Sequence, residues 1–243
     1  MSSDALQIQS IKFENLVFGY ENHEPLLNQV DFEFPVGEMV WVMANTGAGR
    51  SSLLQLMAGL QSPSQGKYLI NDVDMAEMSF EEFLPYRLEI GYGFDMGGLI
   101  NNRSLLENVT LPLIYHKVVP LDEALFRAFG YFEKMNITKY KDLRPAFVPG
   151  GIRKLTCLIR ALVTHPQILL LDDPSVGLGQ DTILRYFDCV QELRKQGRAQ
   201  HVFISSFDDK LMGCIPHKEI FLDCGQIYLD QADRPDSKKV VNL

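Results

Sequence analysis

Residues 44–51 (ANTGAGRS) bring two glycines, an arginine and a serine into one short turn. The spacing is close to G-x-x-x-x-G-K-[ST], a phosphate-binding loop, with alanine at the first glycine and Arg50 at the lysine. Backbone N–H groups around Gly47 and Gly49, and the start of the next helix, favour an anion. Ser51 offers a hydroxyl to Mg²⁺, whereas the planar guanidinium is bulkier than an ammonium. A glycine-rich turn without a ligand is the alternative interpretation.

The elements around this loop predict an α/β protein. Residues 39–43 (MVWVM) are typical of a strand buried on both faces, and residues 51–60 have apolar side chains at helical spacing. The same strand and helix patterns return later, with strands at 168–171, 201–204 and 218–229 and an amphipathic helix around 183–193. Residues 11–13 and 30–34 alternate apolar and polar side chains, which predicts half-buried antiparallel strands.

Composition sets outer limits on the function. The 243 residues are 46% apolar and 22% charged, so the chain can bury a core. Its net charge of −8 argues against non-specific nucleic-acid binding, which requires positive charge. No apolar run approaches the ~18 residues of a membrane span. Met75, Met78, Phe80 and Phe83 are expected in the local core, with contact to a membrane protein as the alternative.

Five further segments, taken in order, resemble the nucleotide-binding domain of ABC transporters over nearly the whole chain. Tyr20 stands where that family has an aromatic ring that stacks on adenine. The others correspond to the turn before the loop, the LSGGQ signature with its helix, the Walker B strand with the D-loop, and the switch histidine, at residues 35–38, 148–162, 168–179 and 204–207.

The resemblance implies a fold and a set of ligands. It implies one α/β ABC-type domain over residues 1–243, with N-terminal antiparallel strands, a mixed-sheet core lobe (about 1–94 and 161–243) and a helical lobe (about 95–160). It also implies ATP and Mg²⁺ as ligands, with Ser51 and Asp172 holding the metal. The nucleotide-binding residues would be Tyr20, Asn45, Thr46, Gly47, Ala48, Gly49, Arg50, Ser51 and Ser52.

The positions that the family uses for hydrolysis are altered. Asp173 replaces the catalytic glutamate, shortening its reach by about 1.5 Å, and a misplacement of ~1 Å can cost ~10²-fold in rate. Phe207 replaces the switch histidine and Asp95 the Q-loop glutamine. In the signature and the D-loop, the substituted residues are Pro149 before the retained Gly150 and Gly151, then Ile152 and Gly179. Because nearly every such position differs, we predict a domain that binds ATP but hydrolyses it slowly or not at all.

The expected role is therefore a transporter subunit. The resemblance implies docking on a separate membrane permease from the cytoplasm, at the inner face of the cell membrane, and a head-to-tail dimer with a second ABC domain, identical or different. Residues 90–113, including Gly97 and Gly98, resemble ATPases of Mce-type lipid transporters. Two alternatives stay open, namely a scaffold or regulator without a permease and an active ATPase that uses Arg50 and Asp173.

Overall fold

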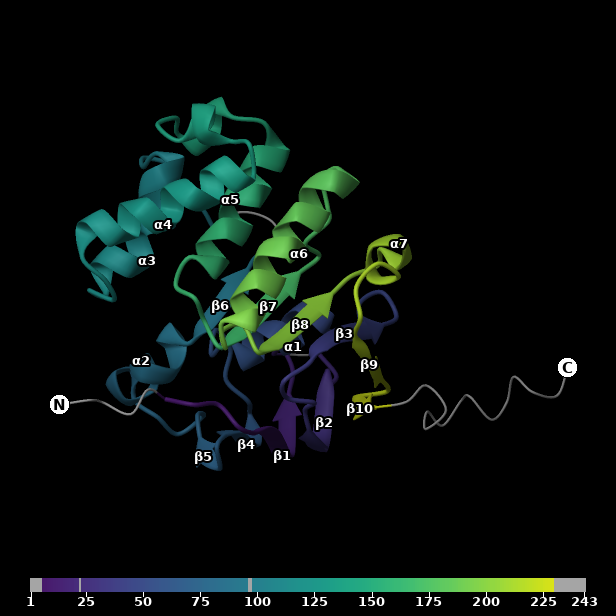
Figure 1. Ribbon diagram of the computed structural model, residues 1–243. Coiled ribbons are helices and arrows are strands. Elements are labelled where there is room, and N and C mark those ends of the chain that lie inside the picture. The colour runs from purple at the N-terminus through teal and green to yellow at the C-terminus, as the bar shows by residue number, and fades with distance from the viewer. Residues whose placement is uncertain (1–5, 22, 96–97, 230–243) are drawn as a thin grey trace, which may run out of the picture.

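The computed structural model describes residues 6–21, 23–95 and 98–229, and within them it has two β-sheets (Figure 1). The smaller sheet has four antiparallel strands in the order β2-β1-β4-β5. Their bounds are Ile11–Phe18 (β1), Leu27–Glu33 (β2), Gln65–Ile70 (β4) and Val73–Asp74 (β5). The half-buried antiparallel strands predicted from the alternating pattern near the N-terminus are confirmed.

The larger sheet has six strands in the order β10-β9-β3-β8-β7-β6. Five of them are parallel, and β10 pairs antiparallel with β9 at the edge. Their bounds are Met39–Ala44 (β3), Ile90–Gly93 (β6), Ile168–Asp172 (β7), His201–Ser205 (β8), Lys218–Asp223 (β9) and Gln226–Tyr228 (β10). The predicted α/β fold with a mixed sheet is therefore confirmed.

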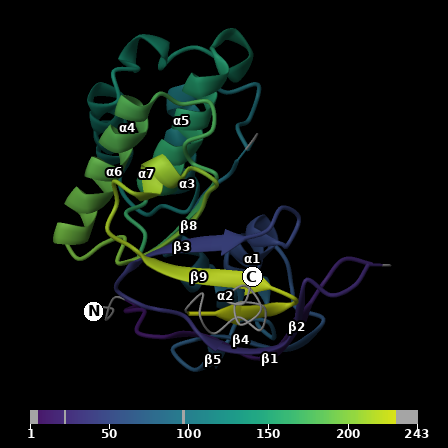
Figure 2. The same cartoon turned by 90° about the vertical axis from the view of Figure 1, so that its right-hand side faces the viewer.

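Seven α-helices and two short 3₁₀ helices complete the described part of the chain. Helices α3, α4 and α5 gather on the side of the molecule away from the four-stranded sheet (Figures 1 and 2). The α-helices are Arg50–Met57 (α1), Phe80–Leu88 (α2), Leu105–Tyr115 (α3), Leu121–Lys134 (α4), Gly150–Leu162 (α5), Gln180–Lys195 (α6) and Asp209–Met212 (α7), and the 3₁₀ helices are Thr138–Tyr140 and Pro145–Phe147. The two-lobe boundaries stay a prediction.

The central strands are buried on both faces because two separate clusters of apolar side chains cover them. In β3, Met39 and Trp41 join the cluster formed with α3 to α6, whereas Val40 and Val42 join the cluster formed with α1 and the smaller sheet. Alternate side chains of a strand point to opposite faces, so the continuous apolar run MVWVM serves both clusters. Helix α1 fills the space between the two sheets, and its residue Met57 accepts a 2.8 Å hydrogen bond from the Tyr68 hydroxyl of β4.

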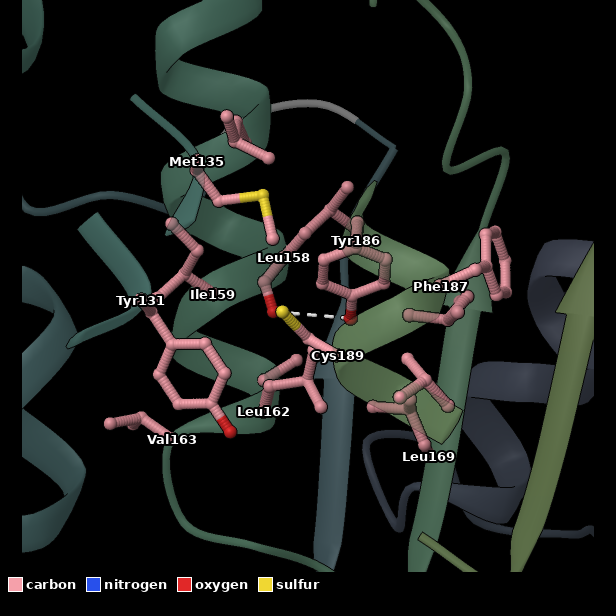
Figure 3. Packing of buried hydrophobic residues seen from close by; sticks show 14 of the residues in the cluster. Tyr131, Met135, Leu158, Ile159, Leu162, Val163, Leu169, Tyr186, Phe187 and Cys189 are labelled. Carbon is pink, nitrogen blue, oxygen red and sulfur yellow. Dashed lines mark hydrogen bonds between the residues drawn. The ribbon is translucent and has the colours of Figure 1, made fainter. Parts of the chain in front are cut away.

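Helices α5 and α6 form the other side of the core (Figure 3). Tyr186 of α6 is fully buried, and its hydroxyl donates a 3.2 Å hydrogen bond to the carbonyl oxygen of Leu158 in α5. This bond meets the requirement that a buried tyrosine hydroxyl find a partner. The bond links α5, which begins at the predicted signature residues, to α6, which follows the predicted D-loop residues.

The segment between α1 and β6 contains elements that the sequence patterns did not reveal, namely β4, β5 and α2. The expectation of a local core is confirmed for Met75, Met78 and Phe83, which pack into the cluster under the smaller sheet. It is wrong for Phe80, whose side chain is 76% exposed. Phe80 is the first residue of α2, directly after the Ser79 N-cap, and is not among the residues that pack in or against the sheet cluster.

Candidate functional site

The candidate residues meet at the carboxyl ends of β3, β7 and β8, which are neighbours in the parallel sheet. Asp172 at the end of β7 and Val42 near the end of β3 are both paired with Ser205 of β8. Because parallel strands end at the same edge, the segments that follow them converge there, and open α/β sheets bind ligands at this edge. The topology alone therefore places the loop at 45–49, Asp173 and Phe207 together.

The turn between β3 and α1 has the backbone of an anion cradle. Gly47 and Gly49 have φ angles of +83° and +96°, a region that a residue with a Cβ rarely adopts. No atom outside the immediate turn lies within 4 Å of a Cβ built at Gly47, so conformation rather than space requires glycine there. The N–H groups of this turn and of the first residues of α1 are free of helical partners by geometry, which is the arrangement that binds phosphate.

A cavity of about 620 Å³ opens over this turn. All the residues predicted to bind nucleotide line it, and the sequence did not indicate His23, Glu24 and Leu26, which line it as well. Tyr20 is 45% exposed, and its hydroxyl lies 3.1 Å from the Ser52 hydroxyl. An exposed ring fixed by a hydrogen bond at one end is suited to stacking on a planar base.

Ser51 and Asp172 form a donor set that fits Mg²⁺. The Ser51 hydroxyl donates a 2.9 Å hydrogen bond to Asp172 Oδ1, and the Ser205 hydroxyl donates one of 2.6 Å to the same oxygen. Tyr92 lies 3.4 Å from the other carboxylate oxygen. Hydroxyl and carboxylate oxygens are the ligands that Mg²⁺ prefers. The Asp172 carboxylate is buried, and Ser51 is close enough to share one ion with it.

Arg50 is turned toward Asp173 and Phe207, two of the residues predicted to stand at hydrolytic positions. Its side chain is 8% exposed, its guanidinium carbon lies 3.4 Å from the centre of the Phe207 ring, and its NH2 lies 3.8 Å from Asp173 Oδ2. Burial lowers the pKa of Arg50 and raises the pKa of Asp173, and in each case it outweighs the attraction between the two groups. The ion pair is therefore desolvated at a cost that its own attraction does not fully offset.

Asp95, predicted to stand at the Q-loop position, is paired with a lysine of helix α5. Its carboxylate oxygen Oδ1 lies 3.5 Å from the Lys154 ammonium and has no hydrogen-bond partner among the described residues. Lys154 donates to the carbonyl oxygens of Phe94, Asp95 and Asp172 at 2.9, 2.9 and 3.0 Å. Asp95 is thus an ion-pair partner of helix α5 and does not line the cavity over the phosphate loop.

The signature residues lie apart from the phosphate loop within this single chain. Gly150 and Gly151 open helix α5 after Pro149 and line a separate cavity of about 420 Å³ with Asp95 and Lys154. A Cβ on Gly151 would lie 2.8 Å from the carbonyl oxygen of Gly177, so glycine lets α5 approach the D-loop segment. A head-to-tail partner would be needed to bring such residues to a phosphate loop.

Three residues that complete the site were missed at the sequence level, namely Tyr92, Lys154 and Ser205. Ser205 and Tyr92 lie on the strands that flank Asp172, so the strand order would have indicated them. Lys154 carries no comparable signal, because a lysine three positions after the second glycine of a helix N-terminus is expected in solvent. Its side chain is 7% exposed.

Comparison with known proteins shows which family this chain belongs to. The sequence profile described as ABC transporter matches residues 27–176. The chain is 32% identical over 181 residues to the lipoprotein-releasing system ATP-binding protein LolD of Colwellia psychrerythraea, covering 74% of this chain and 70% of that protein. It belongs to the ABC transporter family.

Further relatives agree. The cell division ATP-binding protein FtsE of Haemophilus influenzae is 30% identical over 218 residues, covering 89% of this chain and 99% of that protein. A dimeric bacterial ABC transporter cassette superposes with a TM-score of 0.80 at 25% identity, covering 89% of this chain and 96% of that one. The same cassette in a post-hydrolysis state with ADP and phosphate has a TM-score of 0.80 at 24% identity. The ABC fold predicted from the ordered motifs is confirmed.

Proposed function

We propose that this ABC domain is the nucleotide-binding subunit of a membrane transporter, and that it binds ATP with Mg²⁺ but turns it over slowly or not at all. The observation that carries the proposal is that, within one cavity, the groups suited to binding are in place but the groups needed for hydrolysis are not. The phosphate cradle, Ser51 and Asp172 keep an arrangement suited to binding, whereas Arg50 is held by Asp173 and Phe207.

The weak turnover follows from what phosphoryl transfer requires of a protein. Catalysis of this reaction depends on positioning the nucleophile and on stabilising charge at the transferred group. Phe207 has no hydrogen-bond donor, and the Asp173 carboxylate already faces the Arg50 guanidinium. Asp95 is paired with Lys154. We infer that none of the three orients the attacking water or stabilises charge on the transferred phosphoryl group well.

A permease is the partner that we propose. No helix within residues 6–21, 23–95 and 98–229 has the length and apolar character of a membrane span. A groove of about 470 Å³ between α2 and α3 is lined by apolar side chains, including Phe80, Leu84, Leu111 and Tyr115. Phe80 and Tyr115 are 76% and 75% exposed. Such a surface fits a short segment of a membrane subunit, with the chain peripheral on the inner face of the membrane.

A lipidic cargo and a second ABC domain are further parts of the proposal. The resemblance of residues 90–113 to Mce-type ATPases supports lipid transport, although Gly97 of that segment lies outside the described residues. A relative named for lipoprotein release is consistent with an amphiphilic substrate. The dimeric cassettes among the solved structures support a head-to-tail pair, with an identical or a different chain as partner.

Calorimetric titration with Mg-ATP tests the binding step. Wild type is expected to bind, and Tyr20→Ala is expected to lose about tenfold or more in affinity, because a base stacked on an aromatic ring contributes about 1–3 kcal/mol. Tyr115→Ala removes another exposed tyrosine, one that does not line the cavity, and serves as the matched control. An absence of binding at millimolar ATP would reject the nucleotide function and leave the scaffold interpretation.

Phosphate release separates slow turnover from an active enzyme. If the domain is an ATPase that relies on Arg50 and Asp173, phosphate release will be substantial and will disappear in Asp173→Asn. We expect release near background in both proteins. The measurement needs the chain alone and then the chain with its co-purified partners, because an intact second ABC domain could supply the missing groups.

The two tyrosine variants also test the partner. Tyr115→Ala is expected to bind Mg-ATP normally and to co-purify with less of the membrane subunit. Tyr20→Ala is expected to bind Mg-ATP weakly and to co-purify with the membrane subunit as wild type does. Recovery of the chain without any integral membrane protein, at wild-type expression, would favour the regulator without a permease.

A further inference from the structure

We infer that this site holds a nucleoside diphosphate more tightly than the triphosphate. The reason is that Arg50, the cation that a terminal phosphate would need, is already paired with Asp173. The inference rests on the proposed nucleotide-binding function and deepens it by naming the ligand class. It concerns the relative affinity for ADP and ATP, so it can be refuted while the proposal of nucleotide binding still holds.

The inner phosphates are served by groups that do not depend on Arg50. The cradle uses backbone N–H groups around Gly47 and Gly49, whose left-handed φ angles are set by the turn itself. The Ala48 N–H donates to the Asn45 carbonyl oxygen at 3.1 Å, which closes the turn without any side chain. A diphosphate can therefore be held by the backbone and by the start of α1.

The basic residue of such a loop reaches the two outer phosphates, and the backbone N–H groups cradle the two inner ones. The outermost phosphate of a triphosphate is therefore the one that depends most on Arg50. In this chain the guanidinium faces Asp173 Oδ2 at 3.8 Å and is covered on one side by the Phe207 ring at 3.4 Å. A planar guanidinium donates only in its own plane. With one face against the ring and the NH2 edge toward the carboxylate, only its remaining N–H groups can serve a phosphate while the ion pair stays in place.

The remaining charges near that position do not replace it. Of the described residues that line the cavity, Arg50 is the one lysine or arginine, and His23 is the other basic side chain. The Lys154 ammonium is directed at three carbonyl oxygens and at Asp95. Besides Arg50, the charged groups that act on Asp173 are the carboxylates of Asp172 and Asp95 and, with a smaller effect, the Lys154 ammonium.

A third phosphate therefore adds negative charge where a partly buried carboxylate would be left unpaired. The Asp173 side chain is 20% exposed, so water screens this repulsion only in part. A diphosphate needs only the cradle and leaves the Arg50–Asp173 pair closed. On this reasoning, Asp173 is a specificity-determining residue.

Titrations of the full chain with ADP, ATP and AMP in excess Mg²⁺ test the inference. We expect ADP to bind about tenfold more tightly than ATP, which corresponds to about 1.4 kcal/mol, and AMP to bind more weakly than ADP. ATP binding as tightly as ADP, or AMP binding as tightly as ADP, would overturn the inference. If none of the three binds, the proposed nucleotide function fails instead.

Variants assign the preference to Asp173. Asp173→Asn and Asp173→Ser are expected to tighten ATP binding and reduce the ADP preference to about threefold or less, with ADP affinity nearly unchanged. Asp209→Asn is the matched control, because Asp209 lines the neighbouring cavity and is not an ion-pair partner of Arg50 in the described part of the chain. An ADP preference that survives both Asp173 substitutions, in variants that melt as wild type does, would contradict the assignment.

Discussion

Lys154→Met should destabilise this domain by about 2–4 kcal/mol, although it replaces a charged residue by an apolar one of similar length. The ammonium of Lys154 is 7% exposed and donates to three carbonyl oxygens at 2.9, 2.9 and 3.0 Å. Those carbonyls belong to the segment after β6 and to the end of β7, whereas Lys154 itself lies in α5. One side chain therefore joins three elements.

The magnitude comes from two opposing terms. A hydrogen bond to a charged group contributes about 1.5–3 kcal/mol, so three such bonds contribute about 5–9 kcal/mol. Burying an ammonium costs several kcal/mol, and the lowered pKa of Lys154, caused first by burial, indicates that this cost is present. Methionine removes both terms but leaves three carbonyls and the Asp95 carboxylate without their cation.

Urea unfolding followed by circular dichroism measures the effect. Lys195→Met is the matched control, because Lys195 is an exposed residue at the end of α6, where its loss should change the unfolding free energy by about 0.5 kcal/mol. If Lys154→Met unfolds within 0.5 kcal/mol of wild type with an unchanged slope, the three hydrogen bonds do not hold these elements together and the reasoning is refuted.

Four further substitutions test the fold and the site. Gly91→Ala should cost about 3 kcal/mol in urea unfolding, because its Cβ would lie 2.1 Å from a backbone oxygen of α5. Gly130→Ala, with nothing within 4 Å, should instead stabilise α4 by about 0.5–1 kcal/mol. Burial lowers the pKa of His201, so stability should fall below pH 6.5 as the unfolded chain takes up a proton, and His201→Gln should flatten that fall. Ser205→Ala should cost about 1.5 kcal/mol, because it removes the 2.6 Å bond to Asp172, and should weaken Mg²⁺-dependent nucleotide binding.

Strands β3, β7 and β8 of the larger sheet were predictable from sequence because they are buried and mostly apolar along their length. Strand β6 was not predicted, because two of its four residues are glycine and leave no apolar run. The smaller sheet was only partly predictable. Residues 65–70 (QGKYLI) begin exposed and become buried midway, so neither alternation nor a continuous run marks the strand. Helix α2 has no buried residue, which removes the periodicity by which amphipathic helices are recognised.

The candidate site shows the same division. Loop residues and strand-end carboxylates were predictable, because a turn between a buried strand and a helix fixes where they lie. The partners of each side chain were not predictable. Asp95 pairs with Lys154, 59 positions away in sequence, and Arg50 packs on Phe207. Such contacts depend on which strands are neighbours, and no local pattern in the sequence encodes that order.

Contact among the altered residues changes how their substitutions must be read. In the sequence, Arg50, Asp173 and Phe207 are three separate departures from a catalytic pattern. In the structure they form one cluster, with the guanidinium between the carboxylate and the aromatic ring. An apolar ring at 207 covers the guanidinium face, and the short Asp173 side chain meets its edge without reaching past it. Residues in contact do not contribute additively. A histidine at 207 alone would therefore uncover Arg50 without releasing it from Asp173, and a lysine at 50 alone would leave the ring without its planar partner. The departures are better understood as one rearranged site than as a series of independent losses.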